Sequence, residues 1–300
     1  MPSPPSAETL ANFGLTGTPI HIPSGRGLCY RVGDVILKPC DDPAETQWLS
    51  QLSTTLLRLS PTTYRLAMPL PSVSDANDFV VDSWAASSLI TGAPSLSHLD
   101  ALFRASRALH TDLADLVSEK PAAIMNRAVN RYDEADSVTW GEKSLEGIDK
   151  VNYGLLTQLQ PILDRISGAM RPLPESHALL VSQVVHMDLL GNVLFEDNQP
   201  PGIIDLTFYW RPAAYAEAVM AADGLAWHGS LGPEMVNMYL RDSKEGSLDR
   251  EIRVQLLVRA LYWRWLTFVI DADMEWLAVH MPRSNFAGAA EALYALLPAS

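Results

Sequence analysis

Short runs of β-branched and aromatic residues, separated by turn residues, fill the first part of the chain. Strands are predicted at residues 19–23, 28–39, 64–71 and 79–84, and the last of them continues as an extended connector through residue 87. Gly33-Asp34 interrupts the second run and predicts a two-residue hairpin turn. Asp42 then opens a helix as an N-cap acid, with Pro43 at the first helical position and Glu45 as a capping-box residue.

Beyond Thr91-Gly92 the apolar residues recur at the spacing of helices. Helices are predicted at about residues 99–116, 155–166, 212–227, 233–240, 248–270 and 287–297, while residues 121–150 suit a short helix and an insertion. The pattern therefore predicts an α+β protein. Residues 1–87 form a β-rich N-terminal lobe with one main helix, and residues 88–300 form a larger, mostly helical C-terminal lobe.

Composition narrows the class of protein further. The 300 residues are 48% hydrophobic and 19% charged, which is typical of a globular chain. The formal net charge of -13 disfavours a nucleic-acid partner, because phosphate contacts need clustered Lys and Arg, and it tolerates a cationic substrate. No apolar run is long enough to cross a membrane and no secretory leader is evident, so we expect a cytoplasmic protein without a membrane partner. Cys29 and Cys40 are expected to be free thiols.

The stretch from Val184 to Asp205 combines three short apolar runs with polar residues at their ends. These polar residues are His186, Asp188, Asn192 and Asp205. Burying unpaired charges costs several kcal/mol, so charged groups at strand ends indicate chemistry and not core packing. Asp197-Asn198 suits the turn of a hairpin that would bring Asn192 and Asp205 together.

Phosphoryl transfer requires the residue types that this stretch supplies. A carboxylate orients or deprotonates the attacking hydroxyl, and oxygen ligands hold the magnesium that neutralises a triphosphate. Asp188, Asn192 and Asp205 provide these groups. The alternative is that they are loop residues bonding their own backbone, which we disfavour because all the suitable groups fall within one short segment.

The sequence HMDLLGNVLF, followed by GIID, resembles the catalytic and metal-binding loops of the aminoglycoside phosphotransferase and choline kinase group. This group lies within the protein-kinase-like superfamily and usually shows HGDLHPGNVLF and VIDW. The resemblance implies a bilobal kinase fold that uses ATP and Mg²⁺, with a small-molecule hydroxyl as acceptor. It implies that Asp188 is the catalytic base, that Asn192 and Asp205 are magnesium ligands, and that His186 braces the loop.

Two departures from the family pattern stand out. Only Leu189, Leu190 and Gly191 separate Asp188 from Asn192, where the family has four residues, so the loop must follow a tighter path with Gly191 in a conformation that other residues avoid. The residues after Asp205 are also unusually aromatic and include YWRP. A bacterial branch of the superfamily is similar in both respects, so these features resemble subfamily traits.

The N-terminal lobe offers partners for the nucleotide phosphates. Kinases use a strand lysine held by a helix carboxylate, and the order of residues makes Lys38 and Glu45 the expected pair. A solvated lysine at a strand end and a plain capping-box glutamate are equally acceptable readings of each residue alone. Ser24, Gly25 and Gly27 form a loop that can cover phosphates, although two glycines also make an ordinary turn.

The adenine is expected to contact main-chain groups in the hinge at the end of the N-terminal lobe. The residues concerned are Ser83, Trp84, Ala85 and Ala86, although Trp84 is better explained as core or pocket wall. In the C-terminal lobe, Glu217, Asp223 and His228 could face an acceptor, but solvated helix charges are the favoured reading.

The sequence thus predicts an ATP- and magnesium-dependent phosphotransferase acting on a small-molecule hydroxyl, of the sugar, aminoglycoside or amino-alcohol type. The shortened loop leaves open an alternative, a kinase-like nucleotide-binding or regulatory protein without turnover. A protein kinase ranks lower, because no activation segment ending in Ala-Pro-Glu follows Asp205.

Overall fold

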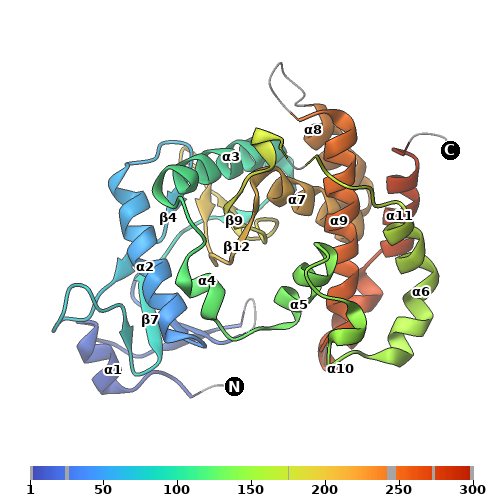
Figure 1. Cartoon of the computed structure of the whole chain (residues 1–300). Coiled ribbons are helices and arrows are strands. Elements are labelled where there is room, and N and C mark those ends of the chain that lie inside the picture. The colour runs from blue at the N-terminus through green and yellow to red at the C-terminus, as the bar shows by residue number, and fades with distance from the viewer. Residues whose placement is uncertain (1–2, 24–26, 175, 242–247, 272–273, 298–300) are drawn as a thin grey trace. The chain divides into compact units, whose positions relative to one another are not determined.

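A computed structural model of the chain (Figure 1) describes residues 3–23, 27–174, 176–241, 248–271 and 274–297. The chain forms two compact units, one of Met1–Ala128 with Gly191–Thr207 and one of Val129–Leu190 with Phe208–Ser300. The lobe boundary expected after residue 87 falls inside the first unit, so the assignment of nucleotide-binding and acceptor lobes stays a prediction. In the described part of the chain, no helix combines the length and apolar character needed to cross a membrane.

The first unit contains most of the strands. Its strands are β1 Ile20–Ile22, β2 Cys29–Val32, β3 Val35–Pro39, β4 Arg65–Leu66, β5 Pro69–Leu70, β6 Val80–Val81, β7 Trp84–Ser88, β8 Ala93–Pro94, β10 Val193–Phe195 and β11 Gly202–Ile203. Its helices are α1 Ala7–Asn12, α2 Pro43–Arg58, the short η1 Leu96–His98, α3 Leu99–Leu116 and α4 Ala122–Asn126. One sheet has the order β1-β2-β3-β7-β5 with β6 also on β7, and a second has the order β4-β11-β10-β8.

The turn between β2 and β3 is the hairpin that the sequence predicts. Val32 pairs with Val35, so Gly33 and Asp34 form the two-residue turn, and Gly33 takes a left-handed φ of 58°. Leu37 on β3 is fully buried in a core that includes Leu10 and Phe13 from the α1 segment. The alternation of the hairpin strands therefore gives the first sheet one face that packs on the N-terminal helix.

The second sheet contains the other predicted hairpin. Strands β10 and β11 are antiparallel, with Val193 opposite Ile203, and Asn198 in their connection has a left-handed φ of 61°. On the outer sides, β8 pairs with β10 and β4 runs parallel to β11. Segment 191–207 is thus held within the first unit by backbone pairing on both sides of the hairpin.

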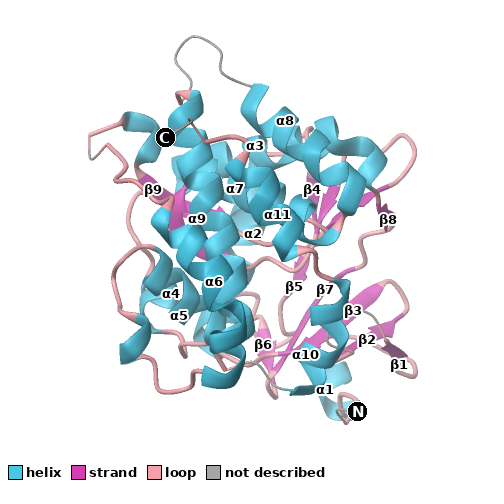
Figure 2. Cartoon of the chain, turned by 90° about the vertical axis from the view of Figure 1, so that its right-hand side faces the viewer, coloured by secondary structure: helices cyan, strands magenta, loops and turns pink. Residues whose placement is uncertain are grey.

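The second unit is mostly helical. Its helices are α5 Arg131–Thr139, η2 Leu145–Gly147, α6 Tyr153–Gly168, η3 Ala178–Leu180, α7 Ala213–Trp227, η4 Gly229–Leu231, α8 Gly232–Arg241, α9 Arg250–Val269, α10 Met274–His280, η5 Met281–Arg283 and α11 Phe286–Tyr294. Within this unit α9 packs against α5, α6, α7 and α11 (Figure 2). Nearly every residue of α7 is buried, so these two helices form the centre of the unit.

The aromatic run after Asp205 is a strand that the sequence did not predict. Strand β12, Phe208–Pro212, pairs with β9, Ser182–His186, in antiparallel register with Phe208 opposite His186. Phe208 and Tyr209 are buried. Aromatic residues suit a half-buried pleated surface, which explains the YWRP run as the partner strand of the segment leading to Asp188.

Helices α7 and α8 approach each other through glycines. A Cβ added to Gly232 would lie 2.7 Å from the Gly224 carbonyl oxygen and 2.7 Å from the Leu225 Cα. These are backbone atoms and cannot move aside without shifting a helix. The contact therefore depends on the absence of a side chain at residue 232.

We expect Gly232→Ala to lower the free energy of unfolding by about 1–3 kcal/mol, because the added methyl overpacks the α7–α8 contact. Urea denaturation followed by circular dichroism measures the change. Gly168→Ala is the control, since no heavy atom lies within 4 Å of a Cβ at this position. An equal loss of stability in both variants would contradict this account of the helix contact.

Candidate functional site

In the first unit, the β10–β11 hairpin brings the segments bearing Asn192 and Asp205 together. The Ile204 amide donates to the Asn192 carbonyl oxygen at 3.0 Å, which continues the strand pairing to the residue next to Asp205. Gly191 has a φ of 92°, the left-handed region expected for the shortened loop, and Asp205 has a φ of 52°. A non-glycine residue in this region is uncommon, although Asp tolerates it, so Asp205 has an unusual backbone geometry.

Lys38, at the end of β3, donates to the Asp205 carboxylate oxygen Oδ1 in an ion pair. Both side chains are about half exposed, at 55% and 46%. An ion pair this exposed contributes about 0–1 kcal/mol to folding, so stability gives little reason for it. The pair links the strand lysine expected to contact phosphates with the carboxylate expected to contact the metal.

The donor groups of Asn192 and Asp205 fit a magnesium ion. Mg²⁺ prefers oxygen ligands and is commonly bound by one or two protein groups together with water and nucleotide phosphates. Asp205 already holds one cation, the Lys38 ammonium. Across the described residues, no group of three or more His, Cys, Asp or Glu side chains is arranged to bind a metal alone. The residues therefore suit a metal that arrives with a phosphate ligand.

The expected pair between Lys38 and Glu45 is wrong. Glu45 accepts from Arg127 Nη1 at 2.7 Å, next to the C-terminal end of α4, and the Arg127 side chain is only 7% exposed. Glu45 also does not close a capping box, because only the Asp42 side chain caps α2. The reason is local: Glu45 lies in the first turn of α2, which packs on α4. Lys38 has Asp205 as its partner instead.

The expected adenine contacts at residues 83–86 need a similar correction. Asp82 and Ser83 form a tight turn with φ values of 48° and 62°, and the chain then enters β7. Ala85 pairs with Lys38 and Val80, and Ala86 pairs with Leu37 and Leu70. Neighbouring strands on both sides thus occupy this backbone, so it is a sheet interior and not an open hinge.

The other residues of the first unit that the sequence singled out are the phosphate-loop candidates, Trp84 and the two cysteines. Ser24 and Gly25 lie outside the described residues. Gly27 has a left-handed φ of 63°, and its carbonyl oxygen lies 2.8 Å from His21 Nε2. Trp84 packs edge to face on Tyr30, with ring centroids 5.9 Å apart, which supports the interpretation of Trp84 as a core residue. Both cysteines are free thiols, as expected.

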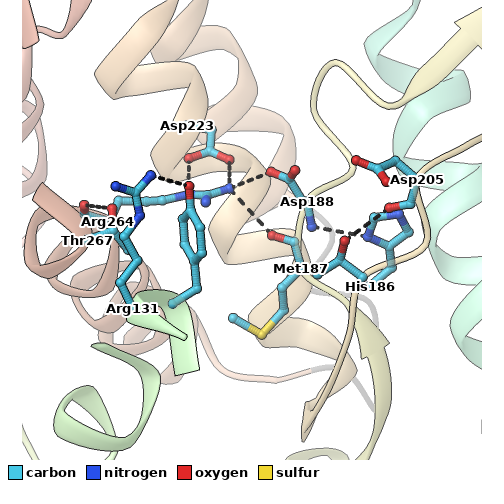
Figure 3. A network of polar contacts seen from close by, with 10 residues as sticks. Arg131, His186, Met187, Asp188, Asp205, Asp223, Arg264 and Thr267 are labelled. Carbon is cyan, nitrogen blue, oxygen red and sulfur yellow. Dashed lines mark hydrogen bonds and ion pairs between the residues drawn. The ribbon is translucent and has the colours of Figure 1, made fainter. Parts of the chain in front are cut away.

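In the second unit, Asp188 lies two residues after the end of β9, and Figure 3 shows its surroundings. The His186 imidazole is completely buried and packs edge to face on the Phe208 ring, with centroids 6.0 Å apart. Its Nδ1 accepts from the Asp188 amide at 3.2 Å. His186 therefore contacts the backbone of the Asp188 loop, and its bracing role stays a prediction.

The Asp188 carboxylate is bound by a buried arginine that the sequence did not reveal. Arg264 Nη2, from α9, donates to Asp188 Oδ1 at 3.0 Å. The same guanidinium donates to both Asp223 oxygens on α7, from Nε and Nη2, at 2.6 Å each. Arg264 is 9% exposed and Asp223 is 4% exposed. Figure 3 shows Arg264 lying between the two carboxylates.

The reading of Glu217 and Asp223 as solvated helix charges is therefore wrong. Both residues are buried on α7, and Glu217 Oε2 lies 4.0 Å from Nη1 of Arg253 on α9. Burial raises the pKa of Asp223 to about 6, while the Arg264 charge opposes the increase. Helix α9 contains four arginines, Arg250, Arg253, Arg259 and Arg264, and the sequence alone does not show which of them have buried partners. His228, by contrast, is exposed.

The arginine of the YWRP run has a structural partner. Arg211 donates from Nε and Nη2 to Asp136 of α5, with the shortest contact at 2.6 Å, and also to Glu142. The Arg211 guanidinium lies over the Trp140 ring, 4.9 Å from its centroid. Burial raises the pKa of Asp136 to about 6 against the lowering effect of Arg211. These contacts hold β12 to α5, and they explain the presence of Arg211 in the run without a role in an active site.

Comparisons with known proteins address the fold. No family model matches the sequence. No curated protein matches it either. Several solved structures match the chain. Spectinomycin phosphotransferase APH(9)-Ia is 12% identical to it, with a TM-score of 0.62 over 96% of both chains. The chain has the fold of small-molecule phosphotransferases.

Two other structures support this conclusion. A microcompartment-associated aminopropanol kinase has 15% identity and a TM-score of 0.58 over 94% of both chains. Choline kinase LicA from Streptococcus pneumoniae has 11% identity and a TM-score of 0.53, covering 96% of this chain and 97% of its own. The resemblance that the catalytic and metal loops suggested is thereby confirmed at the level of the fold.

The Lys38–Asp205 ion pair of the first unit and the Arg264–Asp223 ion pair of the second unit should differ sharply in their effect on stability. We expect Lys38→Met to change the free energy of unfolding by less than about 1 kcal/mol, because its ion pair is exposed. Arg264→Met should cost about 3–5 kcal/mol, because it leaves the Asp223 carboxylate buried without its partner. Denaturant titration of both variants measures the difference, and equal effects would contradict the roles given to these residues.

Proposed function

We propose that this protein is an ATP- and magnesium-dependent phosphotransferase that moves the γ-phosphate to a hydroxyl of a small molecule. The observation that carries the proposal is the ion pair between Lys38 and Asp205. An exposed lysine such as Lys38 is of the type that contacts nucleotide phosphates, and a carboxylate such as Asp205 is of the type that binds their metal. The ion pair shows that these two groups lie in contact. The small-molecule phosphotransferase fold supports the same reaction class.

Asp188 is the catalytic base in this proposal. It orients the acceptor hydroxyl and accepts its proton as the oxygen attacks the γ-phosphorus. The bond from the γ-phosphorus to the bridging oxygen breaks, and ADP leaves. Since the transition state is loose, positioning of the hydroxyl matters more than strong basicity.

Lys38, Asn192 and Asp205 act on the nucleotide. Lys38 donates to phosphate oxygens, and Asn192 and Asp205 would hold magnesium, which when bound neutralises charge on the triphosphate. Nucleotide binding would then replace the Lys38–Asp205 contact with contacts to phosphate and metal. This exchange costs little, because the existing ion pair is exposed.

The acceptor is proposed to be a hydroxyl compound that also carries an amine. The neighbours by fold act on spectinomycin, aminopropanol and choline according to their names. The formal net charge of -13 is compatible with a cationic acceptor. These three compounds are therefore the first panel for a phosphate-transfer assay.

Asp188→Asn should lower kcat for ADP formation by about 10²–10⁴-fold, because the variant loses the proton acceptor. The amide oxygen can still accept from Arg264, so the fold should persist. Binding of ATP with magnesium, measured by isothermal titration calorimetry, should stay within about two-fold of the wild type. Full turnover in the variant, or loss of nucleotide binding, would refute the assignment of Asp188.

Asp205→Asn should remove most of the magnesium-dependent part of thermal stabilisation by ATP, because the variant loses a charged metal ligand. Thermal unfolding is recorded with ATP alone and with ATP plus MgCl₂. Asp34→Asn is the matched control, since Asp34 is an exposed carboxylate that also pairs with a cation, Arg31. An unchanged magnesium effect in Asp205→Asn would count against the metal site.

The rival hypothesis is a nucleotide-binding protein without turnover. It predicts stabilisation by ATP and magnesium with no ADP formation, from either water or any compound of the panel. ADP formation that depends on Asp188 excludes it.

A further inference from the structure

We propose that Arg264 and Asp223 are positioning residues that fix the Asp188 carboxylate for the reaction. Neither residue is expected to touch the acceptor or the nucleotide. The inference rests on the proposed function, because it takes Asp188 as the base that faces the acceptor hydroxyl.

The geometry gives the guanidinium one orientation. Asp223 binds the edge formed by Nε and Nη2, with both contacts at 2.6 Å. Such a two-point contact fixes the plane of the guanidinium. Nη2 carries a second hydrogen, and this donates to Asp188 Oδ1 at 3.0 Å. Asp223 therefore determines where the donor that holds Asp188 is located.

Arg264 has further contacts that restrain it within the unit. Its guanidinium carbon lies 4.4 Å from the centroid of the Trp263 ring. Nη2 also lies 3.5 Å from the Met187 carbonyl oxygen, directly before Asp188 in the chain. Together with the His186 contact to the Asp188 amide, these interactions act on both the backbone and the side chain of the proposed base.

The charges explain why Arg264 needs the buried carboxylate of Asp223 as a second partner beside Asp188. A guanidinium without Asp223 would be free to turn two donors toward Asp188 and form a strong two-point pair with it. That arrangement would withdraw the Asp188 oxygens from a substrate hydroxyl. With Asp223 in place, two carboxylates share one positive charge, and the Asp188 side chain stays 44% exposed.

The packing of α7 on α9 does not explain why Arg264 binds Asp188 in addition to Asp223. A second buried pair, Arg253 with Glu217, joins the same two helices at 4.0 Å. Arg253 lies eleven residues before Arg264, so this pair is about 16.5 Å nearer the N-terminal end of α9 at the helical rise. Buried ion pairs are seldom more stabilising than apolar side chains of the same volume. The Arg253 pair is therefore a matched control for the structural part of the effect.

The test compares Asp223→Asn and Arg264→Lys with Glu217→Gln and Arg253→Lys. ADP formation is followed at saturating ATP with MgCl₂, with water and then with choline, aminopropanol and spectinomycin as acceptors. We expect kcat to fall about 100-fold in the first two variants, as for a misplacement of about 1 Å. The KM for ATP should stay within about two-fold, because the nucleotide contacts are unchanged. Asp223→Glu, which keeps the carboxylate, should recover part of kcat.

The controls decide between positioning and stability. Glu217→Gln and Arg253→Lys should keep kcat within about three-fold even where they lower the unfolding midpoint. Equal losses of kcat in the Asp223 and Glu217 variants, or losses that follow the unfolded fraction, would overturn the proposal.

A crystal structure of Asp223→Asn makes the test independent of turnover. Relative to the Asp188 backbone, the Asp188 carboxylate should move by more than about 0.5 Å, toward a two-point contact with Arg264, whereas Glu217→Gln should leave it in place. An unmoved carboxylate in Asp223→Asn overturns the positioning role. If the wild type forms no ADP from any acceptor, the proposed function fails, while this structural comparison still decides whether Asp223 and Arg264 hold Asp188.

Discussion

A buried guanidinium must have its charge matched, and in this protein the match is shared between two carboxylates. Arg264 binds Asp223 within the core and reaches Asp188 at the end of β9. The two long central helices, α7 and α9, must pack in one register for this contact to exist. The strand pair β9–β12 then sets the backbone from which Asp188 projects. The helical core of the second unit and its candidate chemistry thus depend on the same ion pair.

In the first unit the candidate functional groups are exposed and not buried, because they must remain available to a ligand. Lys38 and Asp205 lie at the ends of paired strands, and their exposed ion pair adds little to stability. The two hairpins, whose strands are held by backbone hydrogen bonds, position these side chains. A rigid scaffold with weakly held charged groups at its ends suits a site that exchanges internal contacts for phosphate and metal.

Local chemistry determines which parts of this structure the sequence predicts. Turn residues at Gly33-Asp34 and Asp197-Asn198 identify both hairpins, and the apolar spacing identifies the long helices. The turn between β6 and β7 has no sequence signal, because Asp82 and Ser83 adopt positive φ there, which non-glycine residues seldom do. Glu45 was given the wrong partner because Arg127 lies 82 residues away in the chain. Arg264 gave no recognisable signal, since its partners on α7 and after β9 come together only in the folded unit.

The most direct test of the central claim is phosphorus NMR of the wild-type protein with ATP, MgCl₂ and the acceptor panel. The account predicts that the γ-phosphate signal of ATP declines while a phosphomonoester signal and ADP appear, and that these changes are at least about 100-fold slower in Asp188→Asn. Binding of ATP and magnesium with a γ-phosphate signal that persists for every acceptor, water included, would contradict it.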